Sequence, residues 1–163
     1  MRPYRVVPEM KTEIERQIQG MLEQGVITHS NSSLSSPIIL VKKEEKGIES
    51  KEWWLVVDYQ HLNALTIKGK YPLPMIDELL DELAGACWFS KLDFRAGFHQ
   101  IRLAPGEEFK TTFHTHNRHF EFKVMAFGLT GAPATFQHAM NASLAPVFRK
   151  FALIFFDDIL IYS

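Results

Sequence analysis

Residues 151–162 read FALIFFDDILIY, in which two apolar, β-prone runs are separated only by Asp157 and Asp158. This pattern predicts a buried β-hairpin with its acids at the bend. The apolar runs predict strands that are covered on both faces, where an ionised carboxylate without a partner is unfavourable. Two interpretations stay open, because Asp is a common turn residue and because a Mg²⁺ ion would offset both charges.

A second apolar segment also ends in an acid, at residues 87–93, which read CWFSKLD. If this segment and the hairpin are neighbouring strands of one sheet, Asp93, Asp157 and Asp158 converge at one edge. Three converging carboxylates suit two Mg²⁺ ions, which can lower the pKa of an attacking hydroxyl and neutralise a leaving pyrophosphate. The acids therefore predict phosphoryl transfer, which needs mainly positioning and electrostatics from a protein.

The composition is that of a globular chain with one core. Its 163 residues, of which 46% are hydrophobic, are enough for one sizeable core. The net charge of −1 gives no overall case for nucleic-acid binding, which must then depend on local basic residues. The one cysteine, Cys87, cannot form an internal disulfide and is expected to be packed. No run is apolar and long enough for a signal peptide or a membrane span, so we expect an intracellular protein without a membrane partner.

Apolar periodicity predicts three helices and two further hairpins. The helices are expected at residues 9–24, 74–84 and 133–144, and the stripe of the second helix is expected in the core: Ile76, Leu79, Leu80 and Leu83. One hairpin is expected to pair strands 38–41 and 53–57 across a mixed-charge connection with a mobile tip, and the other to turn near Asn117. Gly97 indicates a tight change of direction beyond Asp93. Three histidines without zinc-site spacing are expected at the surface, where phosphate could contact them: His114, His116 and His119.

Three motifs, taken in order, resemble those of reverse transcriptases from Ty3/gypsy-type LTR retrotransposons, which are part of a Pol polyprotein. None of these short motifs is specific alone, whereas the ordered set is highly specific. The resemblance extends over nearly the whole chain. Its motifs are LDFRAGFHQI at 92–101, FGLTGAPATF at 127–136 and FFDD at 155–158.

The resemblance implies an α+β fold that comprises the fingers and a partial palm of a right-hand polymerase, with the thumb absent. The palm would contain an antiparallel sheet with packed helices. The whole chain, 1–163, would be a reverse transcriptase domain fragment, with fingers at about 1–68 and 102–131 and palm at about 69–101 and 132–163. The implied activity is RNA-directed DNA polymerisation, in which dNTP is joined to a primer 3′-hydroxyl on an RNA or DNA template. The thumb and RNase H domains of Pol would be further partners.

The same resemblance implies roles for particular residues. Asp93, Asp157 and Asp158 would be catalytic and, with the backbone carbonyl of Phe94, would hold two Mg²⁺ ions. Phe98 would lie under the sugar of the nucleotide and leave no room for a 2′-hydroxyl, which would select dNTP over rNTP. The residues expected to contact the nucleotide are Lys42, Lys43, Phe94, Phe98, Phe127 and Gly128.

The segment around Trp53 and Trp54 departs from the family. An arginine usually follows the first tryptophan and grips the triphosphate, and an indole cannot reproduce its bidentate phosphate contacts. The connection before Trp53 is also longer and more acidic than in the family. Since the chain ends at Ser163, we expect this stretch alone to be a poor polymerase or none. Two alternatives stay open: a non-catalytic, truncated or degenerate remnant with at most weak nucleic-acid binding, and a Mg²⁺ phosphodiesterase or nuclease.

Overall fold

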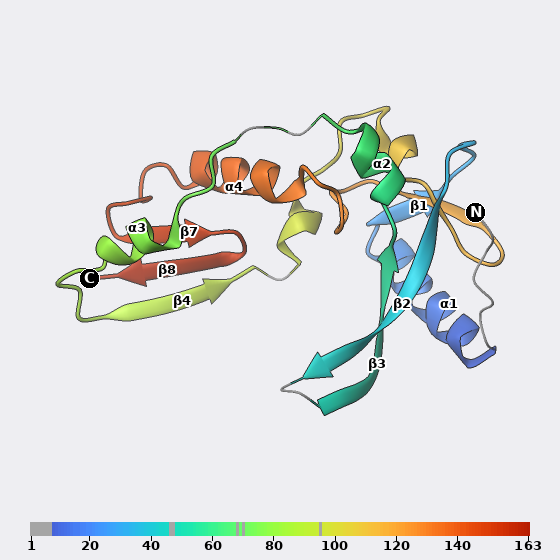
Figure 1. The fold of residues 1–163 in the computed structure, drawn as a ribbon, viewed down its shortest axis with the longest axis horizontal. Coiled ribbons are helices and arrows are strands. Elements are labelled where there is room, and N and C mark those ends of the chain that lie inside the picture. The colour runs from blue at the N-terminus through green and yellow to red at the C-terminus, as the bar shows by residue number, and fades with distance from the viewer. Residues whose placement is uncertain (1–7, 46–47, 68, 70, 95) are drawn as a thin grey trace. The chain divides into compact units, whose positions relative to one another are not determined.

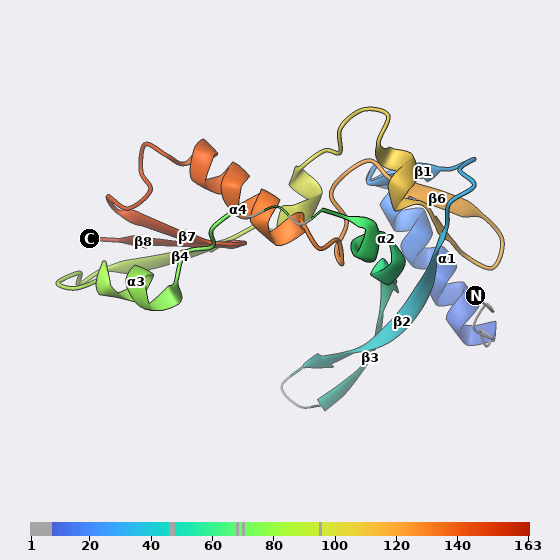
Figure 2. The same ribbon diagram turned by 45° about the horizontal axis from the view of Figure 1, so that its top comes forward.

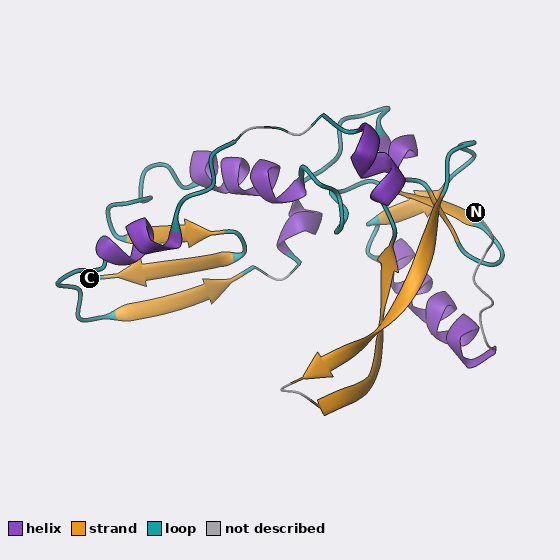
Figure 3. Cartoon of the chain, in the orientation of Figure 1, coloured by secondary structure: helices purple, strands orange, loops and turns teal. Residues whose placement is uncertain are grey.

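The computed structural model describes residues 8–45, 48–67, 69, 71–94 and 96–163, and it describes only the backbone of residues 8, 9, 43–45 and 48–51. Figure 3 shows how helices and strands are distributed over these residues. In chain order they are α1 (Pro8–Glu23), β1 (Ile27–His29), β2 (Ser36–Glu45), β3 (Ile48–Val57), α2 (Gln60–Leu65), α3 (Ile76–Asp81), β4 (Phe89–Asp93), η1 (Gly97–Gln100), η2 (Glu108–Thr111), β5 (Phe113–His114), β6 (His119–Phe122), α4 (Ala132–Ser143), β7 (Ala152–Phe155) and β8 (Asp158–Tyr162).

The chain divides into two compact units, each made of two segments that are far apart in sequence. Unit 1 comprises residues 1–66 and 101–129, and unit 2 comprises residues 67–100 and 130–163. Because the segments are interleaved, neither unit corresponds to a continuous half of the chain.

Unit 1 contains a five-stranded sheet in the order β1-β6-β5-β2-β3, in which only the β2–β5 pair is parallel. Helix α1, blue in Figures 1 and 2, confirms the helix predicted at 9–24 and is followed by Gly25 with φ 68°, a common way to end a helix. Ile14 and Ile18 of α1 are buried together with residues of the sheet and its loops, and Met21 and Leu22 pack against them partly buried. This core comprises Ile14, Ile18, Val26, Ile27, Val57, Tyr59, Phe113, Phe120, Phe122, Val124 and Ala126.

The hairpin of β2 and β3 confirms the predicted pairing of residues 38–41 with 53–57, since Ile38 lies opposite Val57 and Val41 opposite Trp54. The predicted connection between them is too long, because the ladder continues through a bulge to the pair of Glu45 and Ile48. Backbone hydrogen bonds hold a β-ladder whatever charges its side chains carry, so mixed charge did not exclude a strand here. The expected mobile tip falls on residues 46 and 47, which lie outside the described residues.

Unit 2 contains a three-stranded antiparallel sheet in the order β4-β8-β7, with α4 packed beside β7 (Figures 1 and 2). The hairpin of β7 and β8 confirms the prediction for residues 151–162. Coverage on both faces is confirmed only for β7, in which Ala152, Leu153 and Ile154 are buried, whereas β8 buries only Ile159. Coverage decreases across the sheet away from α4, and every residue of the edge strand β4 is exposed.

Helix α4 confirms the helix predicted at 133–144, but α3 is shorter than predicted. Leu79 is buried, whereas Ile76 and Leu80 are 55% and 57% exposed, so the expected core stripe is wrong at these two positions. Six residues make less than two helical turns, which is too short for a continuous buried face. Cys87, expected to be packed, is exposed, two residues before the exposed strand β4. Among the described residues, no helix combines the length and apolar character needed to cross a membrane.

Candidate active site

The pairing of β4 with β8 brings two of the predicted acids together. Asp93, the last residue of β4, lies directly opposite Asp158, the first residue of β8. Residues opposite each other in an antiparallel pair have side chains on the same face of the sheet. Asp158 also pairs with Phe155 of β7, so the turn between β7 and β8 contains only Phe156 and Asp157. We call residues 155–158 the acidic turn.

Asp157 lies within this turn and is partly buried. Its Oδ1 atom is buried without a hydrogen-bond partner in the part of the chain that the structure describes. Its backbone carbonyl accepts a hydrogen bond of 3.1 Å from the N–H of Phe94, which follows β4. Burial raises the pKa of the Asp157 carboxyl, and the charges of Asp93 and Asp158 raise it further. Asp93 and Asp158 are therefore close enough to disfavour the ionised form of Asp157.

The nearest compensating charge described in unit 2 is Lys91. Its Nζ lies 2.9 Å from Oδ1 of Asp158, and both side chains are largely exposed. This hydrogen bond is the main reason why the pKa of Lys91 is raised, and the charge of Asp93 adds to the effect. Exposed ion pairs of this kind contribute little to stability. Lys91 thus offsets the acidic charge only in part, and it does not reach Oδ1 of Asp157, which has no hydrogen-bond partner among the described residues.

The carboxylates are a suitable donor set for Mg²⁺, which prefers oxygen ligands, and the buried Oδ1 of Asp157, which has no hydrogen-bond partner among the described residues, suits a metal ligand. They do not form a preassembled cage, since no three His, Cys, Asp or Glu side chains among the described residues are arranged to hold a metal ion. Like charges without a cation between them repel, and Asp158 is paired with Lys91 instead. The backbone therefore brings the acids together, although their side chains are not in ligand geometry.

Gly97 belongs to the site, whereas the sequence pattern predicts only a change of direction at this position. A Cβ atom at this position would lie 2.9 Å from Cζ of Phe136 and 3.0 Å from Cγ of Asp157, and nearer still to Oδ1 of Asp157. The left-handed residue of this bend is Ala96, with φ 52°, whereas Gly97 has no positive φ. Glycine is needed at position 97 because it leaves room for the Asp157 carboxylate. No sequence signal distinguishes this role from an ordinary turn glycine.

Phe98 is half-buried on η1 and contacts α4 within unit 2. Its ring centroid lies 5.2 Å from that of Phe136, which is itself fully buried. The ring of Phe94 meets Phe136 edge to face, with 6.5 Å between centroids. Phe136 therefore supports both aromatic residues that flank Gly97, and it was not predicted as part of the site.

The other predicted nucleotide-binding residues belong to unit 1. Lys42 of β2 lies opposite Trp53, and its Nζ is 5.7 Å from the centroid of that ring. The side chain of Lys43 lies outside the described residues. Phe127 is 51% exposed. Gly128 has φ 88°, a conformation that favours glycine, and its carbonyl accepts a hydrogen bond of 2.7 Å from Nδ2 of Asn63.

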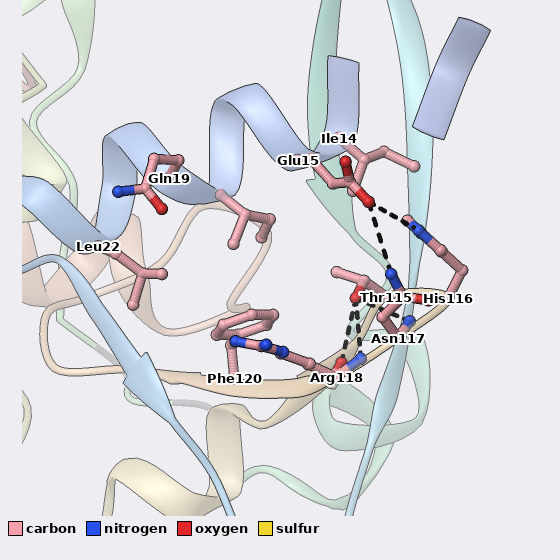
Figure 4. Close-up of a pocket in the computed structure, with 10 residues that line it drawn as sticks. Ile14, Glu15, Gln19, Leu22, Thr115, His116, Asn117, Arg118 and Phe120 are labelled. Carbon is pink, nitrogen blue, oxygen red and sulfur yellow. Dashed lines mark hydrogen bonds and ion pairs between the residues drawn. The ribbon is translucent and has the colours of Figure 1, made fainter. Parts of the chain in front are cut away.

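Unit 1 also contains a hollow of about 230 Å³ between α1 and the turn that joins β5 to β6 (Figure 4). Inside it, Oε1 of Glu15 lies 3.1 Å from Nε2 of His116 and accepts a hydrogen bond from Asn117. Burial and the neighbouring His119 lower the pKa of His114, which reduces its positive charge near neutral pH. Glu15, His116 and Asn117 thus already have partners within the protein. Contact between phosphate and His114, His116 and His119 stays a prediction.

Comparison with known proteins connects this geometry to one family. The family described as reverse transcriptase (RNA-dependent DNA polymerase) matches residues 41–163. The chain is 41% identical over 160 residues to the retrovirus-related Pol polyprotein from transposon 297 of Drosophila melanogaster, covering 98% of the chain and 15% of that relative. It is 48% identical over 109 residues to an RNA-directed DNA polymerase homolog of Oenothera berteroana, covering 67% of the chain and 77% of the relative.

A solved structure of the foamy viral protease-reverse transcriptase in complex with RNA/DNA hybrid has a similar fold. It matches with a TM-score of 0.82 and 21% sequence identity over 100% of the chain and 21% of the foamy viral chain. At this identity the likeness concerns the fold alone, and it confirms the predicted α+β class. The chain spans only a small part of the transposon 297 relative and of the foamy viral protein.

Proposed function

The chain belongs to the reverse transcriptase (RNA-dependent DNA polymerase) family, and we propose that it carries the nucleotidyl-transfer centre of an RNA-directed DNA polymerase. The resemblance of its motifs favours a Ty3/gypsy-type LTR retrotransposon as the source, and the Pol polyprotein relatives support a retrotransposon origin. We further propose that unit 1 belongs to the fingers and unit 2 to the palm of the polymerase, close to the boundaries expected from the sequence.

One observation carries this proposal: Asp93 and Asp158 are paired across β4 and β8, next to Asp157, whose buried Oδ1 has no hydrogen-bond partner in the described part of the chain. A cluster of acids with one buried, unpartnered oxygen is unfavourable unless a cation or a protonated state compensates it. A merely structural turn would instead place its acids in solvent or in hydrogen bonds to backbone N–H groups.

Asp93, Asp157, Asp158 and the backbone carbonyl of Phe94 would hold two Mg²⁺ ions. When bound, these ions supply positive charge that favours the ionised nucleophile and the developing charge on phosphate oxygens. In the proposed reaction, the primer 3′-oxygen forms a bond to the α-phosphorus of dNTP, and the bond from that phosphorus to the bridging oxygen breaks. Pyrophosphate leaves with the electron pair, and the hydroxyl proton passes to solvent.

The chain's own residues position the reactants and exclude the wrong ones. Gly97 leaves space for the Asp157 carboxylate, and Phe136 fixes the Phe98 ring through the contact on α4. A rigid ring at Phe98 would exclude a ribose 2′-hydroxyl by occupying its space. Lys42 and Lys43 would supply positive charge to the triphosphate.

Phe127 and Gly128 would contact the nucleotide and template. The carbonyl of Gly128 is fixed by Asn63, and its φ of 88° suits a loop in which the backbone approaches a ligand closely. The partners that we propose are an RNA or DNA template-primer, dNTP and the remaining Pol domains, including thumb and RNase H. The RNA/DNA hybrid bound by the foamy viral relative supports the first of these.

A chimaera with the transposon 297 polyprotein tests the proposal. The matching 160 residues of the transposon 297 polyprotein would be replaced by this chain, and extension of oligo(dT) on poly(rA) would be measured with Mg²⁺. We expect extension above background that falls at least 100-fold when Asp157→Asn and Asp158→Asn are combined. The parent polyprotein is the positive control.

If the parent polyprotein extends the primer and the chimaera does not, the result would favour a non-catalytic remnant. Extension that survives the double substitution would refute the assignment of the acids. Cleavage of labelled RNA or DNA without dNTP, lost in the same double variant, would favour a nuclease instead.

A further inference from the structure

Gln137 is a buried amide that connects α4 to the acidic turn. Its side chain is 0% exposed, the least of any described polar residue in unit 2. Its Oε1 accepts a hydrogen bond of 2.8 Å from the N–H of Phe156. Its Nε2 donates to the carbonyl of Ile154 at 3.0 Å and to Oδ1 of Asn141 at 2.9 Å. One amide therefore holds two backbone groups of the hairpin.

The backbone group at Phe156 needs such a partner. In a two-residue hairpin the central residues lie outside the ladder, so their N–H and C=O groups must be satisfied elsewhere. The N–H of Phe156 is bound by Gln137, and the carbonyl of Asp157 is bound by the N–H of Phe94. The turn is thus held at both central residues, from α4 on one side and from the end of β4 on the other.

Phe156 is also in a strained conformation. Its φ is 52°, a value required at the first central position of the usual hairpin turns but unfavourable for a bulky side chain. Such strain persists only where the surroundings impose it, and it is found often at functional sites. Phe156 immediately precedes Asp157. A change in the φ of Phe156 would therefore change the direction in which the side chains of Asp157 and Asp158 leave the backbone.

Two further hydrogen bonds connect the Gln137 amide to Asn141 and, through it, to Tyr71. Asn141, one turn along α4, accepts from Gln137 and donates to the hydroxyl of Tyr71 at 3.1 Å. The Tyr71 ring lies edge-on against His138, with 4.7 Å between centroids. Gln137 is thereby locked in one rotamer, which is what a residue that positions another group requires.

We propose that Gln137 is the positioning residue of the acidic turn: its amide holds Phe156 in the left-handed conformation and so aims Asp157 and Asp158 at the cation that they would share. This inference rests on the proposed function, because it assumes that these carboxylates bind a divalent metal. Gln137 touches neither substrate nor metal in this role.

Metal affinity measured on the 163-residue chain tests the inference apart from polymerase activity. Mn²⁺, which takes the same oxygen ligands as Mg²⁺, would be titrated and the free ion followed by electron paramagnetic resonance. The variants are Gln137→Met, which keeps the volume but removes every hydrogen bond to the hairpin, and Asn141→Ala, which removes the hydrogen bonds of Asn141 to Gln137 and Tyr71 but leaves those between Gln137 and the hairpin. Asp157→Asn is the control for loss of the site, and circular dichroism reports folding of each variant.

We expect Gln137→Met to weaken Mn²⁺ binding at least tenfold and Asn141→Ala to weaken it less than threefold. Unchanged affinity in folded Gln137→Met, with affinity lost in Asp157→Asn, would overturn the positioning role and leave the proposed function standing. Equal binding by the wild type and Asp157→Asn would overturn both, because no site would exist at the turn.

Amide hydrogen exchange in the wild-type chain supplies a test that needs no variant to fold. We expect the N–H of Phe156 to exchange at least 100-fold more slowly than in an unstructured peptide, despite its place in a turn. Exchange at the unprotected rate would overturn the inference, since the bond to Gln137 would then not persist in solution.

Discussion

Asp157 combines partial burial with two neighbouring negative charges, and its Oδ1 has no partner among the described residues. Because its pKa is higher in the folded chain than in the unfolded chain, the ionised carboxylate favours the unfolded state. This penalty is absent at low pH, where the group is protonated in both states. It appears as the pH rises above the ordinary value of 3.8 and is complete above the folded-state pKa.

We therefore predict that Asp157→Asn raises the free energy of unfolding of the metal-free chain at pH 7. The gain should disappear as the pH falls toward 3.8, and saturating Mg²⁺ should stabilise the wild type more than the variant. Thermal unfolding with and without Mg²⁺, at several pH values, measures both effects. Asp77→Asn, which changes an exposed acid in the first turn of α3, is the control and should destabilise slightly. A destabilised, metal-free Asp157→Asn would contradict the prediction.

Gly97 supports a second prediction, because a methyl group there would overlap the Asp157 carboxylate and the Phe136 ring. Inserting an extra carbon into packed space costs roughly 1–3 kcal/mol, and displacement of the carboxylate should lower the polymerase rate about tenfold or more. Denaturant unfolding and primer extension by the chimaera measure the two losses.

The matched control for this prediction is Gly20→Ala, since nothing lies within 4 Å of a Cβ atom at that position in α1. That change should stabilise the helix by roughly 0.5–1 kcal/mol, as expected for glycine in a helix interior. If Gly97→Ala behaves like Gly20→Ala, the carboxylate does not need the space.

Each sheet has a strand edge that is covered by a glutamine from a helix. In unit 2, Gln137 of α4 binds the backbone of β7 and the acidic turn. In unit 1, Gln17 of α1 donates to the carbonyl of Trp53 at 2.6 Å and accepts from the N–H of Leu55 at 3.0 Å. Because β3 is the last strand of its sheet, this amide satisfies edge groups that would otherwise be open to another chain.

We predict that Gln17→Ala destabilises unit 1 by about 1–3 kcal/mol, since two backbone groups of β3 lose their partner. The Leu55 amide should also exchange faster with solvent than in the wild type. Denaturant unfolding and amide hydrogen exchange provide the measurements. Gln19→Ala on the same helix, where Gln19 is exposed and bound to Glu23, should change stability by under about 0.5 kcal/mol. Equal effects of the two substitutions would exclude a specific role for Gln17.

The edge of the unit 2 sheet opposite β7 is less protected. Every residue of strand β4 is exposed, with Phe89 and Leu92 each 52% exposed, and Trp88, which precedes the strand, is 79% exposed. An exposed apolar edge strand favours pairing with another chain, and a lysine on such a strand opposes it.

For the whole molecule we therefore predict concentration-dependent self-association of the 163-residue chain, reduced by Leu92→Lys. Sedimentation velocity over a range of concentrations is the measurement. Leu65→Lys, which adds the same charge to an 86% exposed position on α2, is the control and should leave association unchanged. Equal association of all three proteins would exclude β4 as the contact.

The local sequence pattern was sufficient to predict much of the secondary structure of this protein and the acids of its candidate site. The spacing of apolar residues predicted α1, α4 and the hairpins, because an amphipathic period or an apolar run needs only neighbouring residues to be read. The acids that end β4 and begin β8 could be identified because apolar strands flank them. The family followed from the order of three motifs. Exposure of Ile76, Leu80 and Cys87 could not be predicted, because burial depends on which elements pack nearby.

Tertiary structure alone decided how the acids are supported. The pairing of Asp93 with Asp158 joins residues 65 positions apart, and it depends on strand order rather than on either segment. The space at Gly97, the amide contacts of Gln137 and the ring contact of Phe136 each link separate elements. The sequence pattern identifies the three acids, whereas the free energy that holds them close together comes from packing between segments that are distant along the chain.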